Sequence, residues 1–212
     1  MAETQQGRRG SYAKGIAKRE EILERALEVI AREGYRGASV KELAEAVGLS
    51  QAGLLHYFDS KEELFTEILR KRDEVDLAHY APADGPAAPP FPADLDLIPT
   101  YLELIRHNAE VPGLVQLFSR MAVDAADPSH PAHAFFLGRS AALRAVFAEA
   151  LTKLQDDGRL TTAIDADTLA RIFQAVADGL QVQWMQDPDV DMAGTMSALF
   201  DALSTTPTQT QR

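Results

Sequence analysis

The sequence predicts an all-α protein in which a small N-terminal domain precedes a larger helical domain. Apolar residues recur at helical spacing along nearly the whole chain, and no alternating β-branched run between turn dipeptides indicates a strand. Two serines each precede a glutamate by three residues, which is the pattern of a capping box that opens a helix. At 212 residues the chain can form one large domain or two small ones.

The first helix is expected over residues 16–33. Its apolar stripe consists of Ile22, Ala26, Val29 and Ile30. Gly34 follows at a position where glycine readily takes a left-handed conformation and ends a helix. The capping box "SVKE" opens a second helix at Ser39, and Gly48 stops it.

Seven further helices are expected after Gly48. They cover residues 50–58, 60–78, 94–108, 113–126, 131–156, 165–186 and 193–204. Ser60 opens one of them through the second capping box, "SKEE", and Pro99 is expected to bend another. Five of the 11 prolines lie between Pro82 and Pro92, so this segment is expected to be a loop or a semi-rigid connector.

The second and third helices have the features of a helix-turn-helix. Ala44 is small enough for two helices to cross closely, and Gly48 can make the tight turn between them. The apolar residues that can fill the angle are Leu43, Val47, Leu49 and Leu54. The second helix of such a pair enters the DNA major groove, with its N-terminal residues facing base edges. Residues 12–60 are therefore expected to be a DNA-binding domain.

Side chains on the third helix suggest individual contacts with DNA. Ala52 and Gly53 are small, so a nucleic-acid backbone or base edge can come close to them. Gln51 can bond adenine in a bidentate way, or it can serve only water-mediated contacts. The full set of expected DNA-binding residues is Ser39, Lys41, Ser50, Gln51, Ala52, Gly53, Leu55, His56, Tyr57 and Lys61.

Three of these residues, His56, Tyr57 and Lys61, can reach phosphates, which position a protein without reading sequence. For His56 the alternative is an exposed polar side chain with no ligand. Lys61 lies in the first turn of its helix, where a cation is unfavourable for the helix dipole, and this placement favours a phosphate contact.

The charge distribution differs between the two parts of the chain. The formal net charge is −11, but residues 1–72 carry a net +1 and residues 73–212 a net −12. Between Gly7 and Arg19 there are five basic residues and no acidic one. This run is either a solvated tail or an arm that reaches the DNA minor groove. The asymmetry suggests that the two parts have different roles.

The stretch "GLSQAGLLHYFDSKEEL" resembles the tetracycline-repressor (TetR) family of transcriptional regulators. The residues that match the family pattern are Gly48, Leu49, Ser50, Leu54, Tyr57, Phe58, Ser60, Lys61 and Leu64. The resemblance covers roughly residues 22–69, a third of the chain. Leu55 stands where a tyrosine that touches the DNA backbone is common, so that contact cannot be carried over. Leu55 can instead touch a thymine methyl group or pack internally.

The resemblance implies a homodimer whose N-terminal helices bind a DNA operator and whose C-terminal helices bind a small-molecule effector. Residues 61–205 would then form the effector-binding and dimerisation domain, with the last two helices at the dimer contact. Residues 177–192 also look like the penultimate helix of many members. The implied function is a repressor that a ligand releases from a palindromic operator. The alternatives are a DNA-binding protein without an effector and a helical ligand-binding or catalytic protein that no longer uses its DNA-binding domain.

The expected effector cavity is mostly apolar. Its expected lining residues are Phe118, Met121, Phe147, Phe173, Gln174, Asp178 and Gln181. The helix over residues 165–186 is apolar on several faces, which indicates burial on several sides. Its polar line of Gln174, Asp178 and Gln181 either faces the cavity or forms hydrogen bonds across a dimer contact. Asp178 favours a ligand with a cationic or hydrogen-bond-donating group.

Other classes of function find little support. The chain has no cysteine, no G-x-S-x-G elbow, no phosphate loop and no H-E-x-x-H motif, so neither an enzyme nor a cofactor is expected. His130 and His133 suggest a metal site, but Pro131 breaks the helical face that would align them, so no metal is expected. Without a secretory signal or an apolar run of ~20 residues, a cytoplasmic protein with no membrane contact is expected.

Overall fold

The computed structural model describes residues 3–34, 39–80 and 97–205. They form nine helices: α1 (Glu3–Glu33), α2 (Val40–Ala46), α3 (Gln51–Leu55), α4 (Lys61–Tyr80), α5 (Leu97–Glu110), α6 (Pro112–Asp124), α7 (His133–Asp156), α8 (Ala166–Gln186) and α9 (Met192–Leu203). The only strand-like pairing in these ranges is one isolated bridge between Leu160 and Ser204. The prediction of an all-α chain is confirmed.

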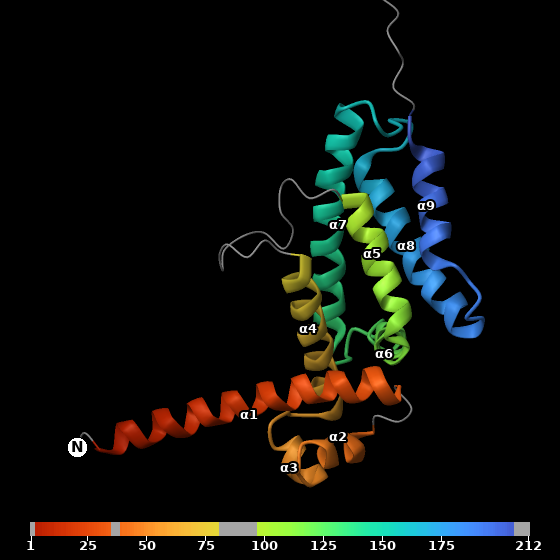
Figure 1. Ribbon diagram of the computed structural model, residues 1–212. Helices are drawn as coiled ribbons and strands as arrows, with labels where there is room; N and C mark the ends of the chain where they lie inside the picture. The colour runs from red at the N-terminus through yellow and green to blue at the C-terminus, as the bar shows by residue number, and fades with distance from the viewer. Residues whose placement is uncertain (1–2, 35–38, 81–96, 206–212) are drawn as a thin grey trace, which may run out of the picture.

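Figure 1 shows α1 lying across the base of an upright helical bundle, with α2 and α3 on the side of α1 that faces away from the bundle. Helix α4 rises from α1 and runs beside α7, while α5, α8 and α9 stand next to them. Within the bundle α7 packs along α8 and α5 along α9. No helix of the described residues is long and apolar enough to cross a membrane.

The first hydrophobic core joins the helix-turn-helix to the bundle. Its buried residues from α1–α3 include Ile22, Ile30, Leu43 and Leu54, and its buried residues from α4 and α6 include Leu64, Ile68, Leu117 and Met121. The expected domain boundary after residue 60 therefore falls inside one continuous core. A second core lies between α5, α7, α8 and α9, with Leu151, Phe173 and Phe200 among its fully buried side chains.

Helix ends follow the expected local chemistry in most places. Ser39 caps α2 and forms a complete capping box with Glu42, and Asp165 caps α8 by accepting the Thr168 N–H. Gly34 and Gly48 have φ values of 75° and 70°, which glycine adopts without strain.

Two helices differ from the expectation. Helix α1 begins at Glu3, well before residue 16, and α3 ends at Leu55 instead of continuing to residue 58. The α3 backbone tightens at its end, where the Tyr57 N–H donates to the Leu54 carbonyl. This turn directs Phe58 back into the first core, where only 3% of the residue is exposed. Pro99 lies in the first turn of α5, where its missing N–H is not needed.

Gly113 is the point where α6 comes closest to α1. A Cβ atom at this position would lie 2.1 Å from the Ile30 carbonyl oxygen and 2.7 Å from the Gly34 Cα. Both neighbours are backbone atoms, so the clash could be relieved only by moving one helix away from the other. A glycine at residue 113 therefore sets the spacing between the helix-turn-helix core and the bundle.

We expect Gly113→Ala to lower the free energy of unfolding by about 1–3 kcal/mol, the usual cost of overpacking, because α6 must shift away from α1. Gly138→Ala is the matched control, since nothing lies within 4 Å of its added Cβ in α7. That control should be neutral or stabilising by up to about 1 kcal/mol, because alanine favours a helix. Urea denaturation at one protein concentration measures both, and equal stability of the two variants would contradict the close approach.

Candidate nucleic-acid interface and internal cavity

The helix-turn-helix is held by short backbone and capping contacts. The Leu49 N–H donates to the Ala44 carbonyl at 2.8 Å, which closes the turn around Gly48. Ser50 caps α3, and its hydroxyl accepts the Gly53 N–H at 3.0 Å. These contacts fix the start of α3 against the end of α2, as expected for a reading helix that must present its N-terminal residues in one orientation.

The residues expected to contact DNA lie mostly at the surface. Those with exposed side chains or backbone are Ser39, Lys41, Ser50, Gln51, Ala52, His56 and Lys61, and those that are half-buried are Gly53, Leu55 and Tyr57. The Gln51 side chain makes no hydrogen bond to any residue that the structure describes. Ser39 and Ser50 already accept backbone N–H groups as helix caps.

Gly53 has a local reason to be glycine. A Cβ atom there would lie 3.2 Å from the Ser50 hydroxyl oxygen and 3.8 Å from the Leu49 Cβ, so a side chain would press on the cap of α3. The expectation that a small residue is needed here for DNA to approach thus competes with an intramolecular explanation. Ala52, by contrast, is exposed, and its small side chain adds little bulk to the surface beside Gln51.

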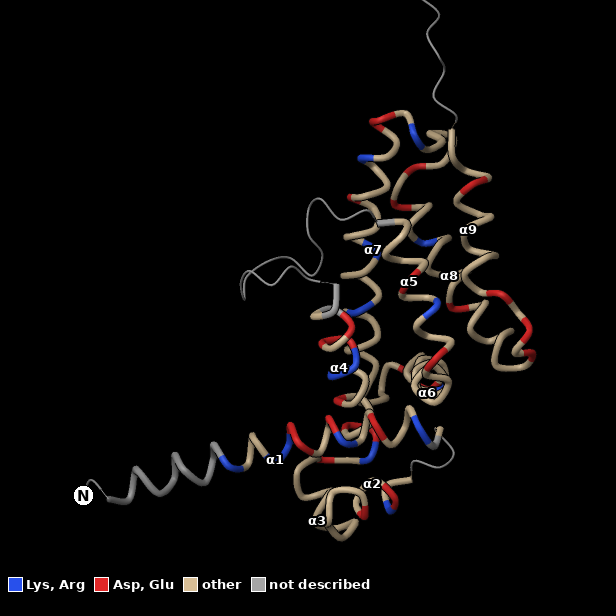
Figure 2. Tube along the Cα trace, in the orientation of Figure 1, with Lys and Arg blue, Asp and Glu red and all other residues tan. Residues whose placement is uncertain are grey.

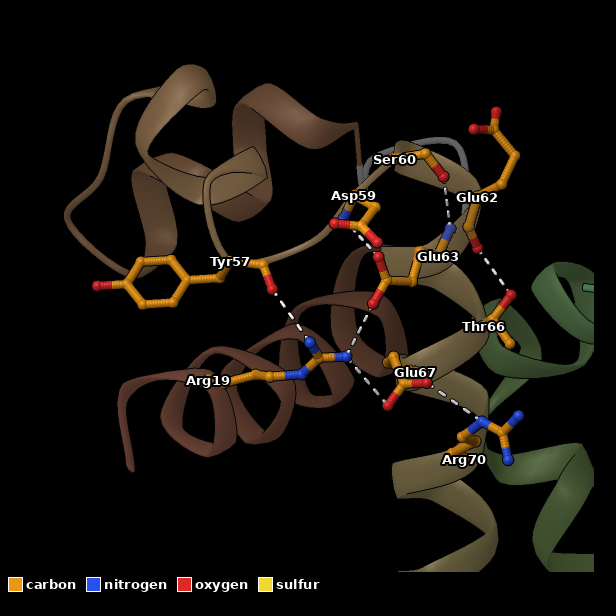
Figure 3. Close-up of polar contacts among 9 residues, drawn as sticks. All are labelled: Arg19, Tyr57, Asp59, Ser60, Glu62, Glu63, Thr66, Glu67 and Arg70. Atoms are coloured by element: carbon orange, nitrogen blue, oxygen red, sulfur yellow. Dashed lines mark hydrogen bonds and ion pairs between the residues drawn. The ribbon is translucent and has the colours of Figure 1, made fainter. Parts of the chain in front are cut away.

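The basic run that ends at Arg19 is expected to be a solvated tail or a minor-groove arm, whereas the structure pairs the Arg19 side chain with residues of the chain itself. Its guanidinium donates to the Tyr57 carbonyl at 3.1 Å and pairs with Glu63 at 3.1 Å and with Glu67 at 3.3 Å (Figure 3). It also lies 4.6 Å from the centre of the Phe58 ring. We call these five residues the Arg19 cluster. The side chains of Arg8 and Arg9, the other end of the basic run, are outside what the structure describes.

A signal for this placement exists in the sequence. Arg19 precedes the buried residues Ile22 and Ala26 by three and seven positions, so it lies on the inner face of α1. The second capping box is also modified: the Glu63 N–H donates to the Ser60 hydroxyl at 3.0 Å, but the Glu63 carboxylate accepts from the Asp59 N–H. Glu63 thereby contacts the turn before α4 and Arg19 of α1 together.

A cavity of about 550 Å³ opens in the bundle between α4, α5, α7 and α8. Five of the seven expected lining residues border it, namely Phe118, Phe147, Gln174, Asp178 and Gln181. Two do not. Met121 is buried in the first core beneath the helix-turn-helix, and Phe173 stacks on Phe200 with 4.0 Å between ring centres. Apolar side chains at helical spacing pack in the core as often as they face a cavity, and the sequence alone could not separate the two.

The cavity wall is more polar than expected because α4 contributes charged residues, and Figure 2 shows basic and acidic positions along this helix. Arg72, which is 7% exposed, donates to the Asn108 side chain and lies 3.4 Å from Asp76. Burial lowers the pKa of Arg72 and raises the pKa of Asp76, while each partner opposes the shift of the other. Arg139 of α7 forms two hydrogen bonds to Asp73, at 2.7 and 3.1 Å. These contacts join α4 to α5 and to α7.

Asp178 differs from the other acidic residues of the cavity wall. It forms no ion pair or hydrogen bond with any residue that the structure describes, whereas Asp73 and Asp76 are each paired with an arginine. Its side chain is open to the cavity, yet the surrounding protein removes enough water to raise its pKa, a shift that Arg139 partly opposes. Tyr101 and Phe147 lie on the same wall, with 4.5 Å between ring centres.

The two histidines of the "HPAH" stretch have structural contacts. The His133 ring lies 2.8 Å from the Ala125 carbonyl, and the His130 ring accepts the Ala132 N–H at 3.2 Å. Within residues 3–34, 39–80 and 97–205 no group of three or more His, Asp or Glu side chains is arranged to hold a metal ion.

Comparison with known proteins matches both parts of the chain. The model of bacterial regulatory proteins of the tetR family matches residues 22–68, and the model of the BetI-type transcriptional repressor C-terminal region matches residues 125–205. The transcriptional repressor AcnR of Corynebacterium diphtheriae is 28% identical over 82% of this chain and 84% of its own length. KstR2 of Mycobacterium tuberculosis, also a transcriptional repressor, is 26% identical over 79% and 81%.

Among solved structures, a transcriptional regulator of Saccharomonospora viridis in complex with choline has the same fold. The TM-score is 0.63 at 22% identity, and the alignment covers 89% of this chain and 98% of that one.

We expect Lys61→Ala and Gln51→Ala to affect DNA binding in different ways. Loss of a phosphate contact at Lys61 should weaken binding to every sequence and reduce the slope of log K against log salt by about 1. Loss of a base contact at Gln51 should relax preference at one base position by about 1–3 kcal/mol. Titrations of specific and random DNA at several salt concentrations measure both effects.

Lys153→Ala is the control for this pair, since it removes the same charge from α7, far along the chain from the helix-turn-helix, and should leave both measurements unchanged. Equal losses on specific and random DNA for Lys61→Ala and Gln51→Ala would contradict the separate roles.

Proposed function

The chain belongs to the TetR family and is a DNA-binding transcriptional regulator, and we propose that it is a homodimeric repressor released from a palindromic operator by a small molecule in the α4–α8 cavity. One observation carries this proposal. Helix α4 begins at Lys61 beside the helix-turn-helix, and its second half supplies Arg72, Asp73 and Asp76 to the cavity wall. A single helix therefore contacts both candidate sites.

The two ends of α4 are held by different interactions. The first half of α4 packs against the helix-turn-helix through apolar side chains, and Leu64 and Ile68 are fully buried in the first core. The second half is held by the ion pairs with Arg139 and by the contacts of Arg72 to α5. A ligand that enters the cavity meets the polar end, and a tilt of the helix then moves the apolar end together with α3.

The switch has to act through geometry because residues 73–212 carry a net charge of −12, which repels DNA. Only a ligand that prefers the tilted state can shift the equilibrium, and a coupling of about 1–3 kcal/mol is typical of such systems. The cavity volume of about 550 Å³ lies in the range of small-molecule sites. An open cavity of this size supports an effector over the alternative of a regulator without one, whose C-terminal helices would pack closed.

The lining chemistry favours an effector with a cationic group on an apolar body. The arginines Arg72 and Arg139 are each matched by an acidic partner on the same wall. Asp178 is the acidic lining residue that remains without such a partner among the described residues. The aromatic rings of Tyr101 and Phe147 can pack against an apolar group and can also attract a cation.

Dimerisation is assigned to α8 and α9. Helix α8 buries Leu169, Phe173 and Leu180 inside the chain, and on its opposite face it leaves Val182 44% exposed. Apolar residues on more than one face of a helix favour a second packing partner. A two-fold axis at this face would place one recognition helix from each subunit on the same side of the dimer.

We expect the protein to select a palindrome from random-sequence DNA, with half-sites about one helical turn (roughly 34–36 Å) apart or slightly more. One helix-turn-helix per chain and a two-fold dimer require this symmetry. Sequencing of the bound pool gives the site, and sedimentation of the complex gives the number of chains on it. Tight binding of one chain to a single asymmetric site would exclude the dimeric arrangement.

We expect cations to bind the cavity more tightly than neutral molecules of the same shape. Choline against 3,3-dimethylbutan-1-ol, and benzyltrimethylammonium against neopentylbenzene, are suitable pairs for calorimetry. Asp178→Asn should reduce the affinity for the cations about three- to tenfold, because an ion pair between Asp178 and the bound cation is only partly desolvated. The affinity for the neutral molecules should stay unchanged. Asp156→Asn, at the exposed end of α7 and outside the cavity wall, is the control.

The cationic and the neutral member of each ligand pair should differ in how their affinity for the cavity depends on pH. A cation binds the ionised form of Asp178, and protonation removes that form as the pH falls. Since burial raises the pKa of Asp178, cation affinity should begin to fall at a higher pH than the ordinary aspartate pKa of about 3.9 would give. Neutral molecules that bind the cavity as tightly as their cations, at every pH, would show that Asp178 is not the anchor.

A further inference from the structure

We infer that Arg19 is a positioning residue for DNA recognition, which holds the recognition segment (residues 50–58) against α4, and that Glu67 connects this contact to the cavity wall through Arg70. The first part concerns the DNA-binding activity itself. The second part rests on the proposed effector function of the cavity.

The Arg19 cluster joins α1 to the turn after α3 and to α4, which follow Arg19 by 38 or more positions. Figure 3 shows the guanidinium of Arg19, on α1, placed between the Tyr57 carbonyl and the carboxylates of Glu63 and Glu67 on α4. The Tyr57 carbonyl belongs to the turn just after α3, where helix-terminal carbonyls lack a partner within the helix. Arg19 supplies that partner at 3.1 Å and so fixes where the recognition segment ends.

The geometry of arginine matters here. One terminal nitrogen donates to the Tyr57 carbonyl, the other pairs with the two glutamates, and the central guanidinium carbon lies 4.6 Å from the centre of the Phe58 ring. A planar fork of donors can satisfy these partners together, whereas a lysine ammonium is a single point with a different reach. The side chains of Arg19, Glu63 and Glu67 are 33%, 29% and 27% exposed, so water competes only in part.

These contacts argue against Arg19 as a DNA-binding arm. Turning the guanidinium toward a phosphate would break three polar contacts and leave two carboxylates close to the recognition segment without their shared cation. The role of Arg19 is therefore to orient the segment that meets DNA, with no contact of its own. This interpretation also predicts that acidic residues support DNA binding, which simple electrostatics would not.

Glu67 extends the cluster toward the cavity. Its two carboxylate oxygens have different partners, since one lies 3.3 Å from Arg19 and the other 3.2 Å from the Nε of Arg70. The Arg70 guanidinium in turn lies 4.8 Å from the centre of the Phe135 ring, and both residues border the cavity. A molecule that displaces Arg70 changes the contacts of Glu67 and, through it, the position of Arg19.

The first experiment compares Arg19→Ala, Arg19→Lys and Glu67→Gln on the palindrome that the wild-type protein selects from random DNA and on random DNA. Each variant should lose roughly tenfold on the palindrome, because charged hydrogen bonds are lost. Affinity for random DNA should change less, and the salt slope should stay the same. Arg25→Ala is the control, since it breaks an exposed α1 ion pair with Glu28 and should be neutral.

Hydrogen exchange keeps this test valid if a variant is less stable. Loosening of the recognition segment should speed exchange of the amides of residues 51–58 in Arg19→Ala, while the amides of α7–α9 stay protected. Equal weakening on both DNAs with a salt slope lower by about 1 would instead identify Arg19 as a phosphate contact and overturn the inference. Tighter DNA binding by Glu67→Gln would overturn it as well.

The second experiment tests the connection to the cavity without any effector. Arg70→Ala should change affinity for the selected palindrome in the wild-type background and have no further effect in the Glu67→Gln background, because the two residues act through one contact. If the affinity changes of Arg70→Ala and Glu67→Gln add in the double variant, the two residues act independently, and Arg70 is no part of the connection to the cavity. Since both experiments use the protein without a ligand, failure to find an effector would count against the proposed function and leave these results unaffected.

Discussion

The architecture depends on one constraint, which is that α4 must pack in the DNA-binding core and line the cavity along a single helix. Its first half satisfies the constraint with apolar residues, since Leu64, Ile68 and Leu69 are at most 1% exposed. Its second half satisfies it with charged residues that find partners on α5 and α7. The helix is thus held by apolar packing at the core and by directional polar contacts at the cavity.

The charged contacts of the cavity wall follow from this division. A buried Arg72 is costly unless it is paired and hydrogen-bonded, and it has both Asp76 and Asn108. Such a network favours one arrangement over others more than it adds stability, because small shifts leave a buried charge without its partner. A wall of this kind has few alternative arrangements, so the proposed displacement of α4 would be an all-or-none event.

The sequence predicted the helices well and the polar contacts poorly, for a physical reason. Helical periodicity and capping boxes are local, so α2 and α4–α9 were found within a few residues. The partners of Arg19 lie 38 or more positions away, and those of Arg72 include a residue 36 positions away, so no short pattern could pair them. Met121 and Phe173 were misplaced because an apolar residue on a buried face gives no sign of whether a cavity lies beside it.

The same pairing explains how an acidic chain can keep a DNA-binding surface. Glu63 and Glu67 lie close to the recognition segment and would lower DNA affinity if their charges faced the phosphates. Arg19 pairs with both carboxylates and so offsets their charge, while Lys61 at the start of α4 is exposed. Binding then depends on how the recognition segment is held rather than on net charge. A regulator built in this way can be switched by a small change of geometry at α4, with no change in its total charge.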